Sequence, residues 1–235
     1  MAPGETIVAA IRVGDDFSGA SYSWFPRSIE RAEAIQGGQA TPIKGRIGDR
    51  PAISHPALGD GLAILVHETD DSTVRYSDWG KFQRFTDRKG FPEAQARHVE
   101  RGGTEASVVE DYRRYAKSLV AVGSGAGADM AVGLDVEIVA LANPYEGAAE
   151  IPVRVLDRGE PAAGKRVEVF ERAPSGEIEI SVLTTDDDGV ASIPVRPGHE
   201  YQVDSVFIDE LDPPSGTGAT WRTLWANLTF MVPEA

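Results

Sequence analysis

The sequence predicts a mainly β protein with two β-sandwich, immunoglobulin-like domains, the N-terminal one carrying a helical insertion. Short stretches alternate apolar and polar residues with period two, as half-buried strands do. Turn-forming residues are abundant, with 25 Gly and 15 Pro among 235 residues. The alternation is interrupted at about residues 77–118, where apolar residues recur at helical spacing. Hydrophobic residues make up 41% of the chain, which is enough to form a core.

Residues 1–145 are predicted to form the N-terminal domain. Its first strand covers Ile7–Val13, and residues 18–60 hold short β-like pieces broken by Gly and Pro. Further strands are predicted at 62–68, 118–123 and 134–140. The run Asn143–Gly147, with its Asn-Pro pair and Gly, marks the expected boundary.

Two short helices are predicted at the start of the insertion. The pair Ser77–Asp78 is expected to cap the first, and Gly90 is its expected stop. The second runs from Pro92 to Arg101. On the first helix one apolar stripe is formed by Trp79, Phe82 and Phe85.

A third helix is predicted to follow, at about 108–118. Ser107 and Glu110 have the spacing of a capping box. Tyr112, Tyr115 and Leu119 follow at helical intervals. We expect the two tyrosines to pack on the N-terminal sandwich.

Residues 146–235 are predicted to form the C-terminal immunoglobulin-like sandwich. Short strands separated by Gly- and Pro-containing turns are typical of this fold. The predicted strands are 150–156, 165–172, 177–184, 190–195, 200–208 and 221–233.

The closing strand has two distinct faces. Its core face is predicted to contain Leu224, Ala226, Leu228, Phe230 and Val232. The other face carries Trp221 and Trp225 beside Thr and Asn, which predicts a half-covered surface. A plain closing strand is the first interpretation, and a ligand-facing pair of tryptophans is the alternative.

Charge and composition exclude several classes of protein. The net charge of −14 opposes binding to nucleic acid. The absence of cysteine excludes disulfides, thiolate metal sites and cysteine nucleophiles. No run of 18 apolar residues is present, so the sequence is not expected to span a membrane.

The short motifs do not predict an enzyme. The glycine-rich run Gly123–Gly127 lacks the spacing of a nucleotide-binding loop, and a strand is predicted after it. Thr184–Gly189 would place Thr184 and Val195 at the acidic ends of a calcium loop, so a hairpin turn is predicted instead. The four histidines form no close ligand pair, and no nucleophile and base are suitably spaced.

One group of carboxylates is a candidate metal site. If consecutive strands of the C-terminal sandwich are antiparallel, alternate connections lie at the same end. The candidate ligands in these connections are Asp157, Asp186, Asp188, Asp209 and Asp212. Carboxylate oxygens suit calcium or magnesium better than nickel, which favours imidazole. The alternative is a solvated acidic rim.

Six stretches together resemble domain-of-unknown-function family 4198, and the resemblance covers nearly the whole chain. They are Tyr112–Lys117, Gly133–Glu137, Asn143–Tyr145, Val155–Pro161, Thr185–Gly189 and Leu224–Phe230. Members are exported bacterial proteins, some of them described as periplasmic components of nickel or cobalt uptake. The resemblance implies a periplasmic or secreted location, with a signal peptide removed from this sequence.

Members usually begin with a short strand that contains histidine and aromatic residues, and this sequence starts beyond it. The resemblance therefore assigns no metal ligand to any residue here. The expected function is a non-enzymatic cell-envelope binding protein linked to divalent metal uptake, with Ca, Ni or Co as candidate cations. An envelope transporter or receptor is the expected partner. The alternative is a carbohydrate- or protein-binding accessory module that uses exposed aromatics such as Trp24, Trp221 and Trp225, and an enzyme comes third.

Overall fold

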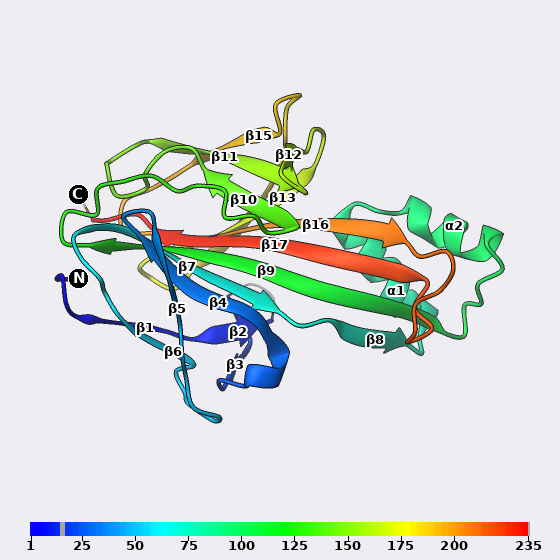
Figure 1. The fold of residues 1–235 in the computed structure, drawn as a ribbon. Helices are drawn as coiled ribbons and strands as arrows, with labels where there is room; N and C mark the ends of the chain where they lie inside the picture. The colour runs from blue at the N-terminus through cyan, green and yellow to red at the C-terminus, as the bar shows by residue number, and fades with distance from the viewer. Residues whose placement is uncertain (15–16, 235) are drawn as a thin grey trace.

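The fold is mainly β, and its largest sheet takes strands from both ends of the chain (Figure 1). This computed structural model describes residues 1–14 and 17–234. The nine strands of the large sheet are β4 (Ile29–Gln36), β5 (Gln39–Pro42), β7 (Gly61–Thr69), β8 (Ser72–Tyr76), β9 (Val108–Val122), β13 (Arg166–Arg172), β14 (Ile178–Thr184), β16 (Glu200–Glu210) and β17 (Trp221–Met231).

In the described residues, three smaller sheets and three helices complete the fold. The four-stranded sheet contains β10 (Val136–Ala140), β11 (Glu150–Asp157), β12 (Glu160–Pro161) and β15 (Val190–Pro194). The two-stranded sheets pair β1 (Thr6–Ala9) with β6 (Ile53–Pro56) and β2 (Ile11–Val13) with β3 (Ala20–Tyr22). The helices are the 3-10 turn η1 (Pro26–Ser28), α1 (Trp79–Lys89) and α2 (Glu93–Glu100).

Strands β9 and β17 join the two halves of the chain inside the large sheet. They pair in parallel from Trp221 beside Glu110 to Thr229 beside Ser118. The strand order is β14-β13-β16-β17-β9-β7-β4-β5, with β8 also paired to β9. Strands from both sides of residue 145 therefore share one sheet. The division into domains 1–145 and 146–235, and the immunoglobulin-like form of each, remain predictions.

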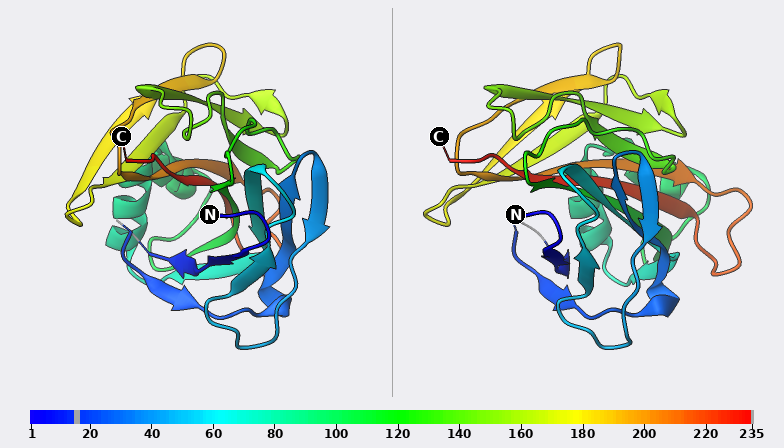
Figure 2. Two further views of the ribbon diagram at one scale, coloured as in Figure 1. Left: turned by 90° about the vertical axis from the view of Figure 1, so that its left-hand side faces the viewer. Right: turned by 60° about the vertical axis from the view of Figure 1, so that its left-hand side comes forward.

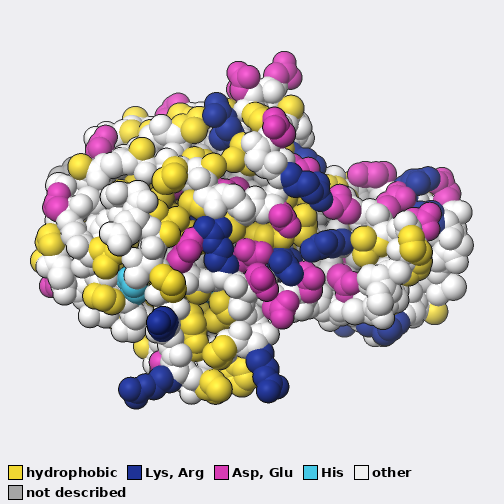
Figure 3. All heavy atoms as spheres, in the orientation of Figure 1, with side chains coloured by type: hydrophobic (Ala, Val, Ile, Leu, Met, Phe, Trp, Pro, Cys, Tyr) yellow, Lys and Arg dark blue, Asp and Glu magenta, His cyan; other side chains and the backbone are white. Residues whose placement is uncertain are grey.

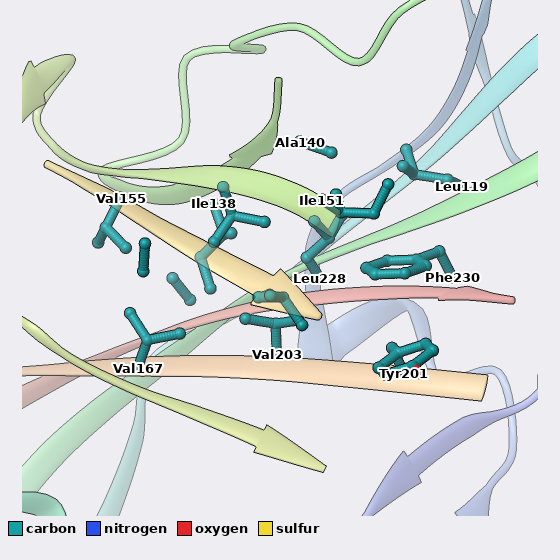
Figure 4. Close-up of a cluster of buried hydrophobic side chains, with 14 of the residues drawn as sticks. Leu119, Ile138, Ala140, Ile151, Val155, Val167, Tyr201, Val203, Leu228 and Phe230 are labelled. Atoms are coloured by element: carbon teal, nitrogen blue, oxygen red, sulfur yellow. The ribbon is translucent and has the colours of Figure 1, made fainter. Parts of the chain in front are cut away.

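The main core lies between the large sheet and the four-stranded sheet. Figure 4 shows Leu228 and Phe230 of β17 beside Val203 and Tyr201 of β16, with Ile151 of β11 across from them. These side chains are 0–4% exposed. The predicted core face of the last strand is confirmed, since Leu224, Ala226, Leu228, Phe230 and Val232 are all buried.

One buried ion cluster connects the two sheets. Lys117 Nζ of β9 lies 2.9 Å from Asp129 Oδ1 and 2.9 Å from Glu137 Oε1, and the three side chains are at most 1% exposed. Glu137 also accepts hydrogen bonds from the backbone N–H groups of residues 132–134. Burial raises the pKa of Asp129, and the charge of Lys117 opposes that rise.

Helices α1 and α2 cover the opposite face of the large sheet at one end, on the same side as the N-terminal strands (Figure 2). Asp78 caps α1 by accepting a hydrogen bond from the Gly80 N–H at 2.9 Å, and Gly90 ends it in the left-handed conformation. Both predicted helices are confirmed. In the described part of the chain, no helix has the length and apolar character needed to cross a membrane.

The predicted third helix is wrong, because residues 108–122 form strand β9. Tyr112 and Tyr115 fit a helical stripe, but on the strand they point to opposite faces, and only Tyr115 is in the main core. Strand β9 is bonded by β17 on one side and by β7 and β8 on the other. This long-range pairing outweighs the local helical pattern. The helical insertion therefore ends with α2, and the supposed capping residue Glu110 is buried in a strand.

The predicted strands of the C-terminal half are confirmed with shifts of a few residues at their ends. They correspond to β11, β13, β14, β15, β16 and β17. The strand predicted at 62–68 is β7, and the segment predicted at 134–140 contains β10. The strand predicted at Ile7–Val13 is divided into β1 and β2.

Candidate functional site

Trp221 belongs to the core beneath the two helices. Its side chain is 2% exposed, and its ring centre lies 6.2 Å from that of Phe82. The indole N–H donates to His98 Nδ1 at 3.1 Å. His98 Nε2 therefore carries the proton and donates to the Thr104 carbonyl at 3.2 Å. Both tryptophans of the closing strand were candidates for ligand contact, but Trp221 is covered by protein.

Trp225, four residues further along β17, is only half-buried. Its ring stacks on Phe85 of α1 with centres 5.9 Å apart. Two cations lie against it: Lys89 Nζ is 5.0 Å and the Arg114 guanidinium carbon 5.9 Å from the ring centre. Trp225 is therefore the tryptophan of the pair that remains accessible.

A patch of half-buried side chains surrounds Trp225 on this face of the large sheet. Strand pairing places them on neighbouring strands β9, β17 and β16. We call this patch the polar floor, and it consists of Tyr112, Arg114, Gln202, Asp204, Trp225 and Asn227. Along the strands it lies between the part of the sheet covered by α1 and α2 and the part covered by the N-terminal strands.

Asp204 is the carboxylate of the polar floor. It accepts hydrogen bonds from the side-chain amides of Asn227 and of Gln202, the latter at 3.3 Å. Burial raises the pKa of Asp204, while the hydrogen bond from Asn227 and the charge of Lys89 oppose the rise. Lys89 is itself paired with Glu168 in a buried ion pair. The direct hydrogen-bond donors of Asp204 are thus neutral amides.

Arg114 is the cation of the polar floor. Its guanidinium carbon lies 4.5 Å from the centre of the Tyr112 ring. Among residues 1–14 and 17–234, no carboxylate lies within ion-pair distance of Arg114. A guanidinium held on aromatic faces keeps its N–H donors available for a planar anion.

A buried hydrogen-bond chain fixes the orientation of Trp225. Its indole N–H donates to Thr223 Oγ1 at 3.0 Å, and the Thr223 hydroxyl donates to Glu110. Glu110 also accepts from the Tyr76 hydroxyl at 2.7 Å and is 2% exposed. Burial raises the pKa of Glu110, and these hydrogen bonds oppose the rise.

The structure brings Asp157 and Asp209 together around a single cation. The Arg158 guanidinium lies 3.0 Å from Asp157 Oδ1 and 3.3 Å from Asp209 Oδ2, and the charge of Asp135 also acts on it. These carboxylates raise the pKa of Arg158. Arg158 has a φ of 50°, a backbone conformation unusual for a residue with a side chain.

The remaining predicted metal ligands have other surroundings. Asp186 Oδ1 accepts from the N–H groups of Asp188 and Val190, at 3.0 and 2.9 Å, within its own turn. Asp212 borders a cavity of about 280 Å³ with His98, Arg101 and Thr220. In the described residues, no three or more His, Asp or Glu side chains are arranged to hold a metal. The metal site at these five aspartates remains a prediction.

Charges of both signs are mixed on the surface. Figure 3 shows acidic and basic side chains intermingled across the middle of one face of the molecule. Ion pairs on the core-side face of the large sheet include Arg113 with Glu68 at 3.0 Å and with Asp71 at 2.8 Å. The acidic excess of the chain is therefore partly compensated locally.

Arg114 and Asp204 were not predicted as site residues from the sequence. The predicted helix at 108–118 concealed Arg114, whose alternation with Tyr112 and Glu110 on one strand face was the available signal. Asp204 lies in a correctly predicted strand, between Val203 and Ser205. Its proximity to Trp225 depends on pairing between β16 and β17.

The comparison with solved structures yields a weak likeness. The crystal structure of a tetra-tandem repeat in the extending region of a large adhesion protein is 11% identical, with a TM-score of 0.21. The match covers 97% of this chain and 50% of that one, so the chain spans about half its length. A TM-score of 0.21 does not establish a shared fold. No curated protein matches the chain.

Two stretches of the family resemblance, 112–117 and 224–230, are adjacent in the structure because they lie on the paired strands β9 and β17. A family model described as a domain of unknown function, DUF4198, matches residues 1–209. The match covers most of the 235 residues. The chain therefore belongs to the DUF4198 family.

Proposed function

We propose that the chain is a non-enzymatic binding protein of the cell envelope, periplasmic or secreted, and that its polar floor binds a small molecule with both a negative and a positive end. The observation that carries the proposal is the placement of Arg114 and Asp204 around Trp225. No carboxylate in the described residues lies within ion-pair distance of Arg114, although its charge acts on buried Glu110, and Asp204 takes hydrogen bonds from neutral amides.

The register sets the size of the ligand. Arg114 is beside Trp225 on β17, and Asp204 is beside Asn227, so Asp204 is two strands from Arg114 and two residues along. The distance between neighbouring strands and the rise per residue place the Cα atoms of Arg114 and Asp204 ~12 Å apart. An extended tripeptide with free ends spans ~10 Å.

The chemistry of the floor suits such a ligand. The guanidinium of Arg114 binds a terminal carboxylate through two N–H groups. The carboxylate of Asp204 binds a terminal ammonium group, and the face of Trp225 supports the middle of the ligand.

Thermal unfolding with named probes tests the proposal. Trialanine is expected to raise the Tm of the wild type, and its uncharged N-acetyl amide form is not. Arg114→Gln should abolish the shift. Arg222→Gln, on the same sheet but the opposite face, is the matched control and should retain it. A shift with sugars instead would favour the carbohydrate-binding alternative through Trp225.

A link with divalent metal uptake, involving nickel or cobalt and an envelope transporter or receptor, is the second candidate. The family resemblance implies it, and the grouping of Asp157 and Asp209 near Asp135 supports it. Arg158 supplies the counter-charge to these carboxylates. A divalent cation would therefore compete with the Arg158 guanidinium, and isothermal titration calorimetry with Ca²⁺, Ni²⁺ and Co²⁺ tests this candidate.

A further inference from the structure

Strand β14 is the outer edge of the large sheet. It pairs with β13 through seven consecutive residue pairs without a bulge, and no second strand borders it among residues 1–14 and 17–234. Its apolar side chains are open to solvent, with Ile178 37%, Ile180 51% and Val182 44% exposed. Each of the three pairs with Arg172, Phe170 or Glu168 of β13, so they share one face of the sheet.

The hydrogen-bonding direction of β14 follows from the bonds at its two ends. The N–H of Ala173 donates to the Glu177 carbonyl, and the N–H of Thr185 donates to the Lys165 carbonyl. Bonded and non-bonded pairs alternate in an antiparallel ladder. The intervening bonded residues of β14 are therefore 179, 181 and 183. The backbone N–H and C=O groups that point away from β13, toward the open edge, are those of Ile178, Ile180 and Val182.

This edge lacks the features that usually prevent strand addition. Lysine, proline and bulges protect edge strands, and Ile178–Thr184 contains none of them. The acidic residue within it, Glu179, is paired with Arg196 at 2.6 Å. The open backbone groups and the exposed apolar side chains therefore belong to the same three residues.

We propose that β14 pairs with β14 of a second copy of this chain, antiparallel and symmetric about Ile180. In this register Ile178 lies opposite Val182 of the second copy, and Ile180 lies opposite its own equivalent. On the other face Glu179 lies opposite Ser181, so no like charges face each other. All three outward-bonding pairs exchange backbone hydrogen bonds.

Neighbouring registers are less favourable. Symmetry about Glu179 would place two glutamates directly opposite each other. Symmetry about Ser181 would place Ile178 opposite Thr184. Only the register centred on Ile180 matches apolar residues with apolar residues throughout, and this self-complementarity is what an interface with two-fold symmetry requires.

The charge of the chain predicts how the dimer responds to salt. Each copy carries a net charge of −14, so the two copies repel at long range. Salt screens that repulsion but leaves the strand pairing and apolar contacts in place. The dimer is therefore expected to strengthen as the salt concentration rises.

Sedimentation equilibrium of the full chain at low and high salt tests the proposal. The wild type should dimerise, and Ile180→Lys should be monomeric because it places two like charges at the symmetry axis. Ser181→Lys is the matched control, since it adds the same charge opposite Glu179 and should keep the dimer. Circular dichroism establishes that each variant is folded. A wild type that is monomeric up to roughly 1 mM, or an Ile180→Lys variant that still dimerises, would overturn the proposal.

Discussion

Arg114 of β9 lies directly beside Trp225 of β17, and its guanidinium carbon is 5.9 Å from the centre of the indole ring. The two residues come from strands separated by most of the C-terminal half of the chain. Their contact exists only because β9 and β17 pair in parallel at the middle of the large sheet. The same pairing makes the stability of the fold depend on both halves.

Lys117→Met is expected to destabilise the protein by about 3–5 kcal/mol, because it leaves Asp129 and Glu137 buried without their cation. Urea unfolding at neutral pH measures the loss. Adding Glu137→Gln to this variant should recover part of the stability by removing one uncompensated charge. A cost near that of an ordinary surface change, about 0.5 kcal/mol, would contradict the buried cluster.

Glu110→Gln is expected to alter the pH dependence of stability. The pKa of Glu110 is raised in the folded protein, so the folded state binds more protons than the unfolded state between the two pKa values. The stability contributed by this group therefore falls as pH rises through that window. Glu110→Gln should remove this fall. The free energy of unfolding of the variant, relative to that of the wild type, should therefore increase as pH rises.

Urea unfolding across the acid to neutral range measures that difference. Glu105→Gln, at an exposed position, removes the same charge and is the matched control. Parallel curves for the wild type and Glu110→Gln would mean that the buried carboxyl has an ordinary pKa.

Arg158→Ala is expected to increase the affinity of the acidic surface for Ca²⁺ by about tenfold or more, because Asp157 and Asp209 lose their shared cation. Calorimetry of the wild type and the variant measures the change. Arg196→Ala is the matched control, since Arg196 also lies between two carboxylates, Glu171 and Glu179. An equal gain in both variants would mean a general effect of charge.

A fragment of residues 146–235 is expected to remain unfolded. It lacks β9, the parallel partner of β17, and β10, whose five residues are all buried and which contributes Val136, Ile138 and Ala140 to the main core. The NMR amide spectrum of this fragment should be collapsed, whereas a fragment of residues 103–235 should show more dispersion. A well-dispersed spectrum for 146–235 would support an independent domain beginning near residue 146.

Local patterns were sufficient for much of the fold. Strict alternation identified β17 and its core face, and capping residues Asp78 and Gly90 identified the ends of α1. These features depend on neighbours in sequence. The helical residues and the half-covered face of β17 were both recognised, but the sequence alone did not show that Phe82 lies against Trp221 and Phe85 against Trp225.

The polar floor could not be derived in the same way. Tyr112, Tyr115 and Leu119 have the spacing of a helix, and only strand pairing on both sides of β9 overrides that local pattern. Parity of the connections placed Asp157 and Asp209 in one predicted group. It could not reveal that the Arg158 side chain lies between their carboxylates.

The central claim is that a bipolar ligand binds at Trp225 between Arg114 and Asp204, and the most direct measurement is the indole N–H spectrum during titration with trialanine. The chain has four tryptophans, so Trp225→Phe assigns its signal by loss of one peak. Trialanine is expected to shift the Trp225 signal more than the signals of buried Trp24 and Trp221. Arg114→Gln should abolish this shift, and Arg222→Gln should retain it. A Trp225 signal that does not move, or one that moves equally in Arg114→Gln, would contradict the account.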